Sequence, residues 1–179
     1  MSLPPLILVG MPGTGKTHWG RRLASMHEVP FTDLDAWVEQ KSGTSPSTFL
    51  TSGRAVEFRH WEAAGLRAWL EKPDGILATG GGTPLVPDCL SVLLRFPRVL
   101  LLISPPEVRL DRMQESPRPL LTGANPASLQ ARLEAERGLV YSAVAKAVVD
   151  TSGAQHDVEQ RLLDILASMS NGAFRAPTP

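Results

Sequence analysis

The chain has 179 residues, 42% of them hydrophobic and 20% charged, which is the balance of an ordinary globular protein with one sizeable core. Its 18 Lys and Arg residues equal its 18 Asp and Glu residues, and this zero formal charge argues against a nucleic-acid or anionic-membrane partner. A single cysteine, Cys89, excludes a disulfide within the chain and favours a reducing compartment.

Short apolar runs alternate with helical patterns along the chain. The apolar runs do not alternate with polar residues, so they predict strands that are covered on both faces. We expect strands at residues 6–9, 29–32, 76–79, 99–103 and 147–149. We expect helices at residues 15–26, 35–41, 46–51, 56–69, 88–94, 107–113, 128–140 and 158–169. This order predicts an α/β fold of three layers, in which helices cover both faces of a parallel five-stranded sheet.

Residues 1–169 are predicted to form a single domain. Within it, the segment 115–126 contains three prolines, a glycine and an asparagine between two helical patterns. Such a composition prevents regular structure, and we expect a mobile lid at about residues 115–125. Residues 170–179 are polar and contain proline, so they are expected to form a flexible tail.

The strongest functional signal is a phosphate-binding loop. Residues 10–17 read GMPGTGKT and match the pattern G-x-x-x-x-G-K-[ST] in full, between an apolar strand and a helical pattern. The glycines let backbone N–H groups converge on phosphate oxygens, and the helix N-terminus adds partial positive charge. Lys16 is expected to reach the β- and γ-phosphates, and the Thr17 hydroxyl to bind magnesium. A glycine-rich turn without function is the less favoured alternative.

Two aspartates come directly after the second expected strand. P-loop proteins often end a later strand with an aspartate of the metal site, but the strands at 76–79 and 99–103 end without a carboxylate. Asp33 and Asp35 are candidates to supply the missing acid, because strand ends in such a sheet open onto the ligand crevice. Their alternative role is to cap the following helix.

An acceptor pocket is indicated by residues further along the chain. Arg59 and Glu62 fall on one face of an expected helix, although an exposed ion pair is the commoner explanation of this spacing. Gly80, Gly81 and Gly82 follow the third strand. They would allow a ligand to approach the backbone closely, or they would form only a flexible turn.

Two arginines in the last third of the chain have a functional and a neutral interpretation. Arg118 lies in the expected lid, from which it can swing onto a transferring phosphoryl group or remain a solvated loop charge. Arg137 precedes Tyr141 by four residues near the end of an expected helix, where an arginine also complements the helix dipole.

Taken together, these pieces resemble the shikimate kinase family from residue 6 to about residue 166. The resemblance is carried by the phosphate loop, Asp33 and Asp35, the block Phe58-Arg59-x-x-Glu62 with Gly53 before it, the three glycines, the sequence RPLL at 118–121, and Arg137 with Tyr141. It implies a P-loop NTPase fold and transfer of the ATP γ-phosphate to the 3-hydroxyl of shikimate. The product would be shikimate 3-phosphate, an intermediate of chorismate and aromatic amino-acid biosynthesis.

The resemblance also implies roles for individual residues. The implied catalytic residues are Lys16, Asp35 and Arg118. The implied ATP-binding residues are Gly13, Thr14, Gly15, Lys16, Thr17, Arg112 and Arg118, with Thr151 and Ser152 on the adenine side. The implied shikimate-binding residues are Asp35, Arg59, Gly80, Gly81, Gly82 and Arg137, and the acceptor-binding region is expected at about residues 33–62. Thr17 and Asp33 would hold Mg²⁺, the cofactor, with Asp33 in its outer shell.

Within this assignment, Asp35 would hold the acceptor hydroxyl and either receive its proton or only orient it. Arg59 and Arg137 would clamp the shikimate carboxylate, because a planar guanidinium fork matches a carboxylate. His18 and Trp19 depart from the small or polar residues usual in the family, which puts the packing on the nucleotide side in question.

Other functions remain open at this point. A gluconate-type kinase would share the phosphate loop and the lid, and a catalytically weak nucleotide-binding module would more naturally have lost Asp35 or Arg118, which are both present. A nucleoside monophosphate kinase is disfavoured because no second basic set for another phosphate is visible. The first residues contain no basic leader or cleavable apolar segment, and the apolar runs are too short to cross a bilayer. We therefore expect a cytoplasmic monomer whose partners are ATP and shikimate.

Overall fold

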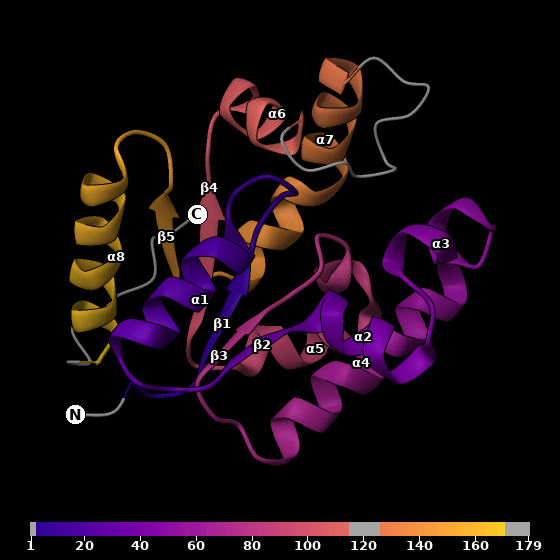
Figure 1. The fold of residues 1–179 in the computed structure, drawn as a ribbon, viewed down its shortest axis with the longest axis horizontal. Helices are drawn as coiled ribbons and strands as arrows, with labels where there is room; N and C mark the ends of the chain where they lie inside the picture. The colour runs from indigo at the N-terminus through magenta and orange to yellow at the C-terminus, as the bar shows by residue number, and fades with distance from the viewer. Residues whose placement is uncertain (1–2, 115–125, 171–179) are drawn as a thin grey trace.

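The computed structural model of the protein describes residues 3–114 and 126–170. Within these residues, five strands form one parallel sheet in the order β2-β3-β1-β4-β5 (Figure 1). The strands are β1 (Leu6–Val9), β2 (Phe31–Asp33), β3 (Ile76–Ala78), β4 (Val99–Ile103) and β5 (Ala147–Asp150). The prediction of a parallel five-stranded α/β sheet is confirmed. The predicted lid at 115–125, and the predicted tail beyond Ser170, lie outside the described residues.

Helices connect the strands and cover both faces of the sheet. They are α1 (Lys16–Met26), α2 (Leu34–Ser42), α3 (Pro46–Thr51), α4 (Ala55–Glu71), α5 (Pro87–Arg95), α6 (Pro106–Gln114), α7 (Pro126–Val144) and α8 (Gln155–Ser170), with a 3₁₀ turn η1 (Thr83–Leu85). Over the described ranges, none of these helices combines the length and the apolar character that a membrane span requires.

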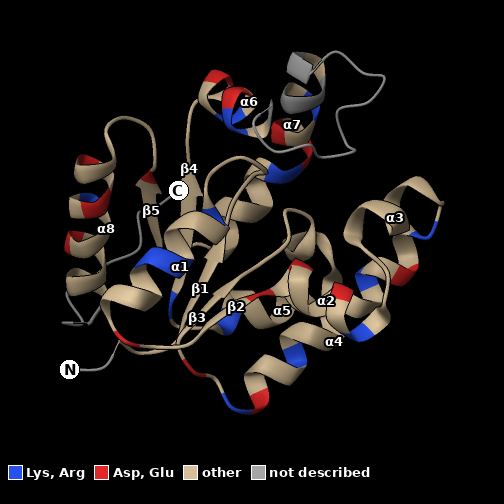
Figure 2. Ribbon diagram, viewed as in Figure 1, with Lys and Arg blue, Asp and Glu red and all other residues tan. Residues whose placement is uncertain are grey.

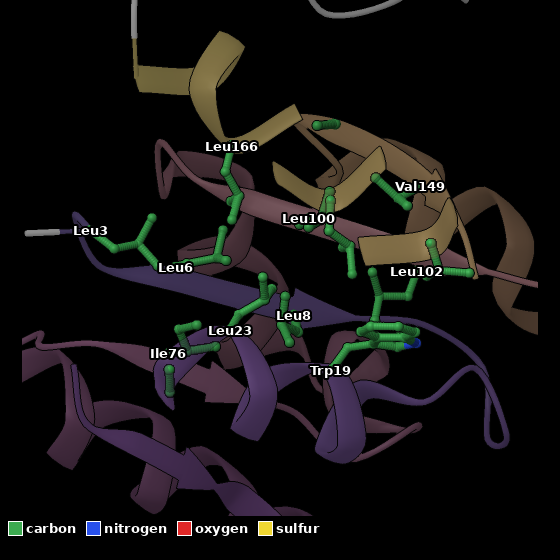
Figure 3. Packing of buried hydrophobic residues seen from close by; sticks show 14 residues of the cluster. Leu3, Leu6, Leu8, Trp19, Leu23, Ile76, Leu100, Leu102, Val149 and Leu166 are labelled. Carbon is green, nitrogen blue, oxygen red and sulfur yellow. The ribbon is translucent and has the colours of Figure 1, made fainter. Parts of the chain in front are cut away.

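The strands send alternate side chains into two apolar layers. From β1, Leu6 and Leu8 join a cluster that α1 and α8 cover, whereas Ile7 and Val9 join a cluster that α4, α5 and α7 cover. Figure 3 shows the first cluster, in which Trp19 of α1 lies beside the β4 side chain Leu102. Because both faces are covered, the strands are apolar at successive positions and not at every second one.

A third, smaller cluster lies apart from the sheet, where α2, α3 and α4 meet. It consists of Val38, Phe49 and Phe58, and the rings of the two phenylalanines stack at 5.6 Å between centroids. Ser45 begins α3 as predicted, because its side chain accepts a hydrogen bond from the Thr48 backbone N–H at 3.1 Å. These helices form the right-hand part of the molecule in Figure 1.

The second strand differs from its predicted position. It was expected at residues 29–32 but spans Phe31–Asp33, because Val29 donates its N–H to Ala24 at the end of α1 and Pro30 has no N–H to donate. The strand also ends one residue later, with Asp33 as its last member, because Asp33 is paired with Ala78 of β3. Figure 2 shows the strands almost without charged residues, apart from the acidic ends of β2 and β5.

The connectivity defines where a ligand can bind. The chain leaves β1 toward β2 and β3 on one side, and later toward β4 and β5 on the other. In an open α/β sheet, ligands bind beyond the carboxyl ends of the strands at such a reversal. The loop after β1, the aspartates at and just beyond the end of β2, and the glycines after β3 all lie at this edge.

Candidate active site

The loop between β1 and α1 has the backbone of a phosphate cradle. Gly10, Gly13 and Gly15 have φ angles of 148°, 85° and 85°, which residues with a Cβ rarely adopt. A Cβ on Gly10 would also lie 2.4 Å from the Leu102 carbonyl oxygen. The buried Thr14 hydroxyl closes the loop by donating to the Met11 carbonyl at 2.8 Å. These contacts fix the loop in one conformation.

The start of α1 is suited to an anion. Gly15 is the N-cap and supplies no side-chain hydrogen bond, and the first turn carries no acidic residue, so the positive end of the helix is not neutralised from within. The Lys16 ammonium donates to the carbonyls of Gly10 at 2.7 Å and Met11 at 3.0 Å, which holds it over the loop.

Asp33 joins the phosphate loop to the next helix. Its Oδ2 accepts a hydrogen bond from the Thr17 hydroxyl at 2.6 Å, while its Oδ1 caps α2 by accepting from the N–H groups of Asp35 at 3.0 Å and Ala36 at 3.3 Å. The sequence left open whether Asp33 serves the metal or the cap, and the geometry allows both.

These oxygens also fit the expected cation. No group of three or more His, Cys, Asp or Glu side chains in the described part of the chain could hold a metal ion alone. Mg²⁺ at nucleotide sites takes only one or two protein oxygens and completes its shell with phosphate and water. A hydroxyl with an adjacent carboxylate is such a set of hard donors, so Thr17 and Asp33 fit Mg²⁺.

The glycines after β3 bring the acceptor residues together. A methyl group on Gly80 would lie 2.6 Å from both Asp35 Oδ1 and Glu62 Oε1. A methyl group on Gly82 would lie 2.4 Å from both terminal nitrogens of Arg59. Because the glycines of this turn have no side chains, there is room beside it for Asp35 of α2 and Arg59 of α4.

Glu62 is not the exposed ion-pair partner that its spacing suggested. It is fully buried, its Oε2 pairs with Arg59 Nη1, and its Oε1 accepts from the Thr83 hydroxyl at 2.5 Å. Both carboxylate oxygens are therefore used to orient neighbours. Thr83 was not identified from the sequence, because a threonine in a short turn carries no distinguishing pattern.

Arg137 and Tyr141 of α7 approach the same turn from the other side. Arg137 Nη1 and the Tyr141 hydroxyl both donate to the Gly81 carbonyl oxygen, at 2.8 Å and 2.5 Å. Burial raises the pKa of the Tyr141 phenol, with Arg137 opposing, so the hydroxyl remains a donor at neutral pH. The structure thus brings the predicted residues Asp35, Arg59 and Arg137 to one turn.

The nucleotide side is lined by the remaining described candidates. Arg112 donates to the Thr151 carbonyl at 2.6 Å and to its hydroxyl at 3.3 Å, and lies 3.4 Å from the Gly13 carbonyl oxygen. Trp19 is buried against Gly15, so this aromatic residue serves packing. These residues line a cleft of about 960 Å³ that also reaches Lys16, Asp33 and Asp35. Arg118 lies outside the described residues.

Known proteins that resemble this chain in sequence and those that resemble it in structure point to the same family. Curated shikimate kinases of Mycobacterium avium (strain 104) and Mycobacterium tuberculosis (strain CDC 1551 / Oshkosh) are each 37% identical over 149 residues, which is 83% of this chain and 85% of each relative. A solved shikimate kinase from Acinetobacter baumannii, in complex with shikimate, superposes with a TM-score of 0.84 at 33% identity, over 93% of this chain and 94% of that one.

A second solved shikimate kinase, from Bacteroides thetaiotaomicron, has a TM-score of 0.81 at 25% identity, over 90% of this chain and 97% of that one. A gluconokinase from Sinorhizobium meliloti 1021 covers 97% of both chains with a TM-score of 0.58, but at 20% identity this likeness concerns the fold alone.

The parallel sheet, the phosphate loop and the adjoining acceptor pocket define an ATP-dependent kinase of the P-loop class. The family model described as Shikimate kinase matches residues 12–167. The chain belongs to the shikimate kinase family.

Proposed function

We propose that this chain transfers the γ-phosphate of ATP to the 3-hydroxyl of shikimate, and so supplies shikimate 3-phosphate to aromatic amino-acid biosynthesis. The observation that carries this proposal is the grouping of Arg59, Arg137 and Asp35 around Gly80, Gly81 and Gly82. Two guanidinium groups suit a carboxylate, and a carboxylate beside them suits a hydroxyl, so the pocket matches an acceptor that has both.

In the proposed reaction, the acceptor oxygen attacks the γ-phosphorus in line with the bond that breaks, and ADP leaves with that bond's electron pair. Asp35 orients the attacking hydroxyl and can receive its proton. Lys16 and the N–H groups of the loop and of α1 hold the phosphates and offset the charge that develops on them. Mg²⁺, held by Thr17 and, through its outer shell, by Asp33, would neutralise phosphate charge when bound.

A turnover assay with purified protein tests this function. With ATP, Mg²⁺ and shikimate, we expect stoichiometric formation of ADP and shikimate 3-phosphate, detected by a coupled assay and by mass spectrometry. Gluconate in place of shikimate is the comparison, because a gluconokinase shares the fold. Faster turnover with gluconate, or no acceptor-dependent turnover, would contradict the proposal.

The single domain at residues 1–169, the cytoplasmic location and the monomeric state stay predictions.

Asp33→Asn is expected to raise the Mg²⁺ concentration needed for half-maximal activity by about tenfold, because one carboxylate charge near the cation is lost. Asparagine is also a good N-cap, so α2 should remain capped through the amide oxygen. The measurement is a Mg²⁺ titration of activity at saturating ATP and shikimate. An identical shift for Asp35→Asn would contradict the separate roles of the two aspartates.

Gly82→Ala is expected to raise the KM for shikimate by about tenfold with little change for ATP, because the new methyl displaces the Arg59 guanidinium. The backbone at Gly82 has φ −106°, which alanine tolerates, so the effect is confined to that contact. Gly138→Ala is the matched control: this exposed position on α7 has open space around it. An unchanged KM for shikimate in Gly82→Ala would contradict the role of Arg59 in binding the acceptor.

A further inference from the structure

Arg109 of α6 is a buried charge that the proposed reaction does not use. Its exposure is 4%, its Nη2 pairs with Glu134 of α7, and its Nη1 donates to the Ser104 carbonyl at 3.1 Å. Its Nε is buried without a hydrogen-bond partner in the described part of the chain. Burial of a guanidinium is costly unless a carboxylate pairs with it, and Glu134, whose side chain is 44% exposed, supplies that carboxylate.

The same residue lies directly behind the phosphate loop. A methyl group on Gly13 would lie 2.7 Å from the Arg109 carbonyl oxygen and 2.9 Å from its Cβ. One turn later on α6, Arg112 approaches the Gly13 carbonyl. Helix α6 is therefore packed onto the loop that is to hold the phosphates, and no side chain larger than hydrogen fits between them.

Glu134 lies on the helix that carries the acceptor arginine. Glu134 and Arg137 are three residues apart on α7, and residues at this spacing share one side of a helix. Arg137 in turn donates to Gly81 in the acceptor turn. The Arg109–Glu134 pair thus connects α6, which is seated on the donor loop, to α7, which reaches the acceptor turn, and the two helices lie side by side in Figure 1.

We propose that Arg109 and Glu134 are positioning residues, which fix α7 relative to the phosphate loop so that Arg137 holds the acceptor at the correct distance from the γ-phosphate. This inference rests on the proposed function. Phosphoryl transfer depends on how the acceptor is placed relative to the γ-phosphate, and a displacement of about 1 Å can lower the rate about a hundredfold. Neither residue lines the cleft, so the pair is expected to act through Arg137.

The first test is Glu134→Gln, which keeps the size and removes the charge. We expect the KM for shikimate to rise about five- to tenfold and kcat to fall, while the KM for ATP stays within about twofold of wild type. Glu136→Gln is the matched control on the same helix: its pair with Arg132, at 3.6 Å, is exposed on both sides. It should behave as wild type.

A second variant separates positioning from stability. Arg109→Met together with Glu134→Gln removes both charges. It places an apolar side chain at the buried position and keeps a polar one at position 134, where the Glu134 side chain is 44% exposed, so no buried charge is left without a partner. We expect a melting temperature at or above that of wild type, but a KM for shikimate that stays about as high as in Glu134→Gln. If Glu134→Gln fails to fold, the double variant alone tests the inference.

Either of two results for the KM for shikimate would overturn the inference. The first is a wild-type KM in Glu134→Gln, and the second is a wild-type KM in the double variant together with a wild-type melting temperature. The second result would make the pair purely structural. An equal rise of both Michaelis constants would also contradict it. Absence of shikimate turnover in the wild-type protein would instead contradict the proposed function, and this is measured before any variant is made.

Discussion

Asp35→Asn is expected to lower kcat about a hundred- to ten-thousandfold while ATP binding is retained. Asparagine keeps the shape of the side chain beside Gly80, but it can neither accept a proton from the acceptor hydroxyl nor orient it as a carboxylate does. Asp33, which faces Thr17 and caps α2, is untouched, so the nucleotide side should remain intact. The measurement is steady-state kinetics with both substrates, together with ATP binding by calorimetry.

Asp74→Asn is the control for this change, since Asp74 is exposed in the loop before β3. It should leave kcat within about twofold, as surface substitutions away from a site usually do. If Asp35→Asn retained most of the wild-type kcat, Asp35 would have no role in the chemical step. If it abolished ATP binding instead, its role would lie on the nucleotide side.

Arg59→Lys is expected to raise the KM for shikimate at least about tenfold, because a point charge replaces a planar fork that can bind a carboxylate through two parallel hydrogen bonds. Lysine is preferable to alanine here. Glu62 is fully buried, and removing its only salt-bridge partner among the described residues would destabilise the fold by about 3–5 kcal/mol. Lysine preserves the charge and so limits the change to geometry.

The matched control is Arg67→Lys, the same substitution on the same helix. Arg67 pairs with Asp88 at 3.0 Å, but both side chains are well exposed, and such pairs contribute little. Michaelis constants for both substrates and the melting temperature are measured for each variant. Near-wild-type kinetics in Arg59→Lys would show that no planar carboxylate contact is made at this position.

The parts of this molecule that could be predicted from sequence are those with local patterns. The phosphate loop is a contiguous motif whose glycines, lysine and threonine each have a backbone or ligand requirement. The strands are apolar at successive positions because both faces are covered, and Ser45 before Pro46 marks the start of α3. β2 begins two residues later than predicted, because the Val29 N–H bonds back to Ala24 at the end of α1, which the apolar run alone does not reveal.

Burial of charge could not be predicted in the same way. The spacing of Arg59 and Glu62 is identical for an exposed pair and for a buried one, and only the packing of Thr83 and the glycine turn against Glu62 distinguishes them. Arg109 and Glu134 are 25 residues apart, on either side of a segment without regular pattern, so nothing in the sequence joins them. Arg112 and Thr151 are 39 residues apart, and only the family resemblance placed both on the adenine side.

The cluster of Val38, Phe49 and Phe58 is separate from the two clusters on the sheet. Phe58 is the neighbour of Arg59, whose guanidinium lies 5.2 Å from the Phe58 ring centroid. Segments with a small core of their own can open locally at lower free energy than the whole domain. We therefore expect α3, whose buried residue Phe49 belongs to this cluster alone, to be a region where substitutions can change acceptor selectivity with less effect on the use of ATP.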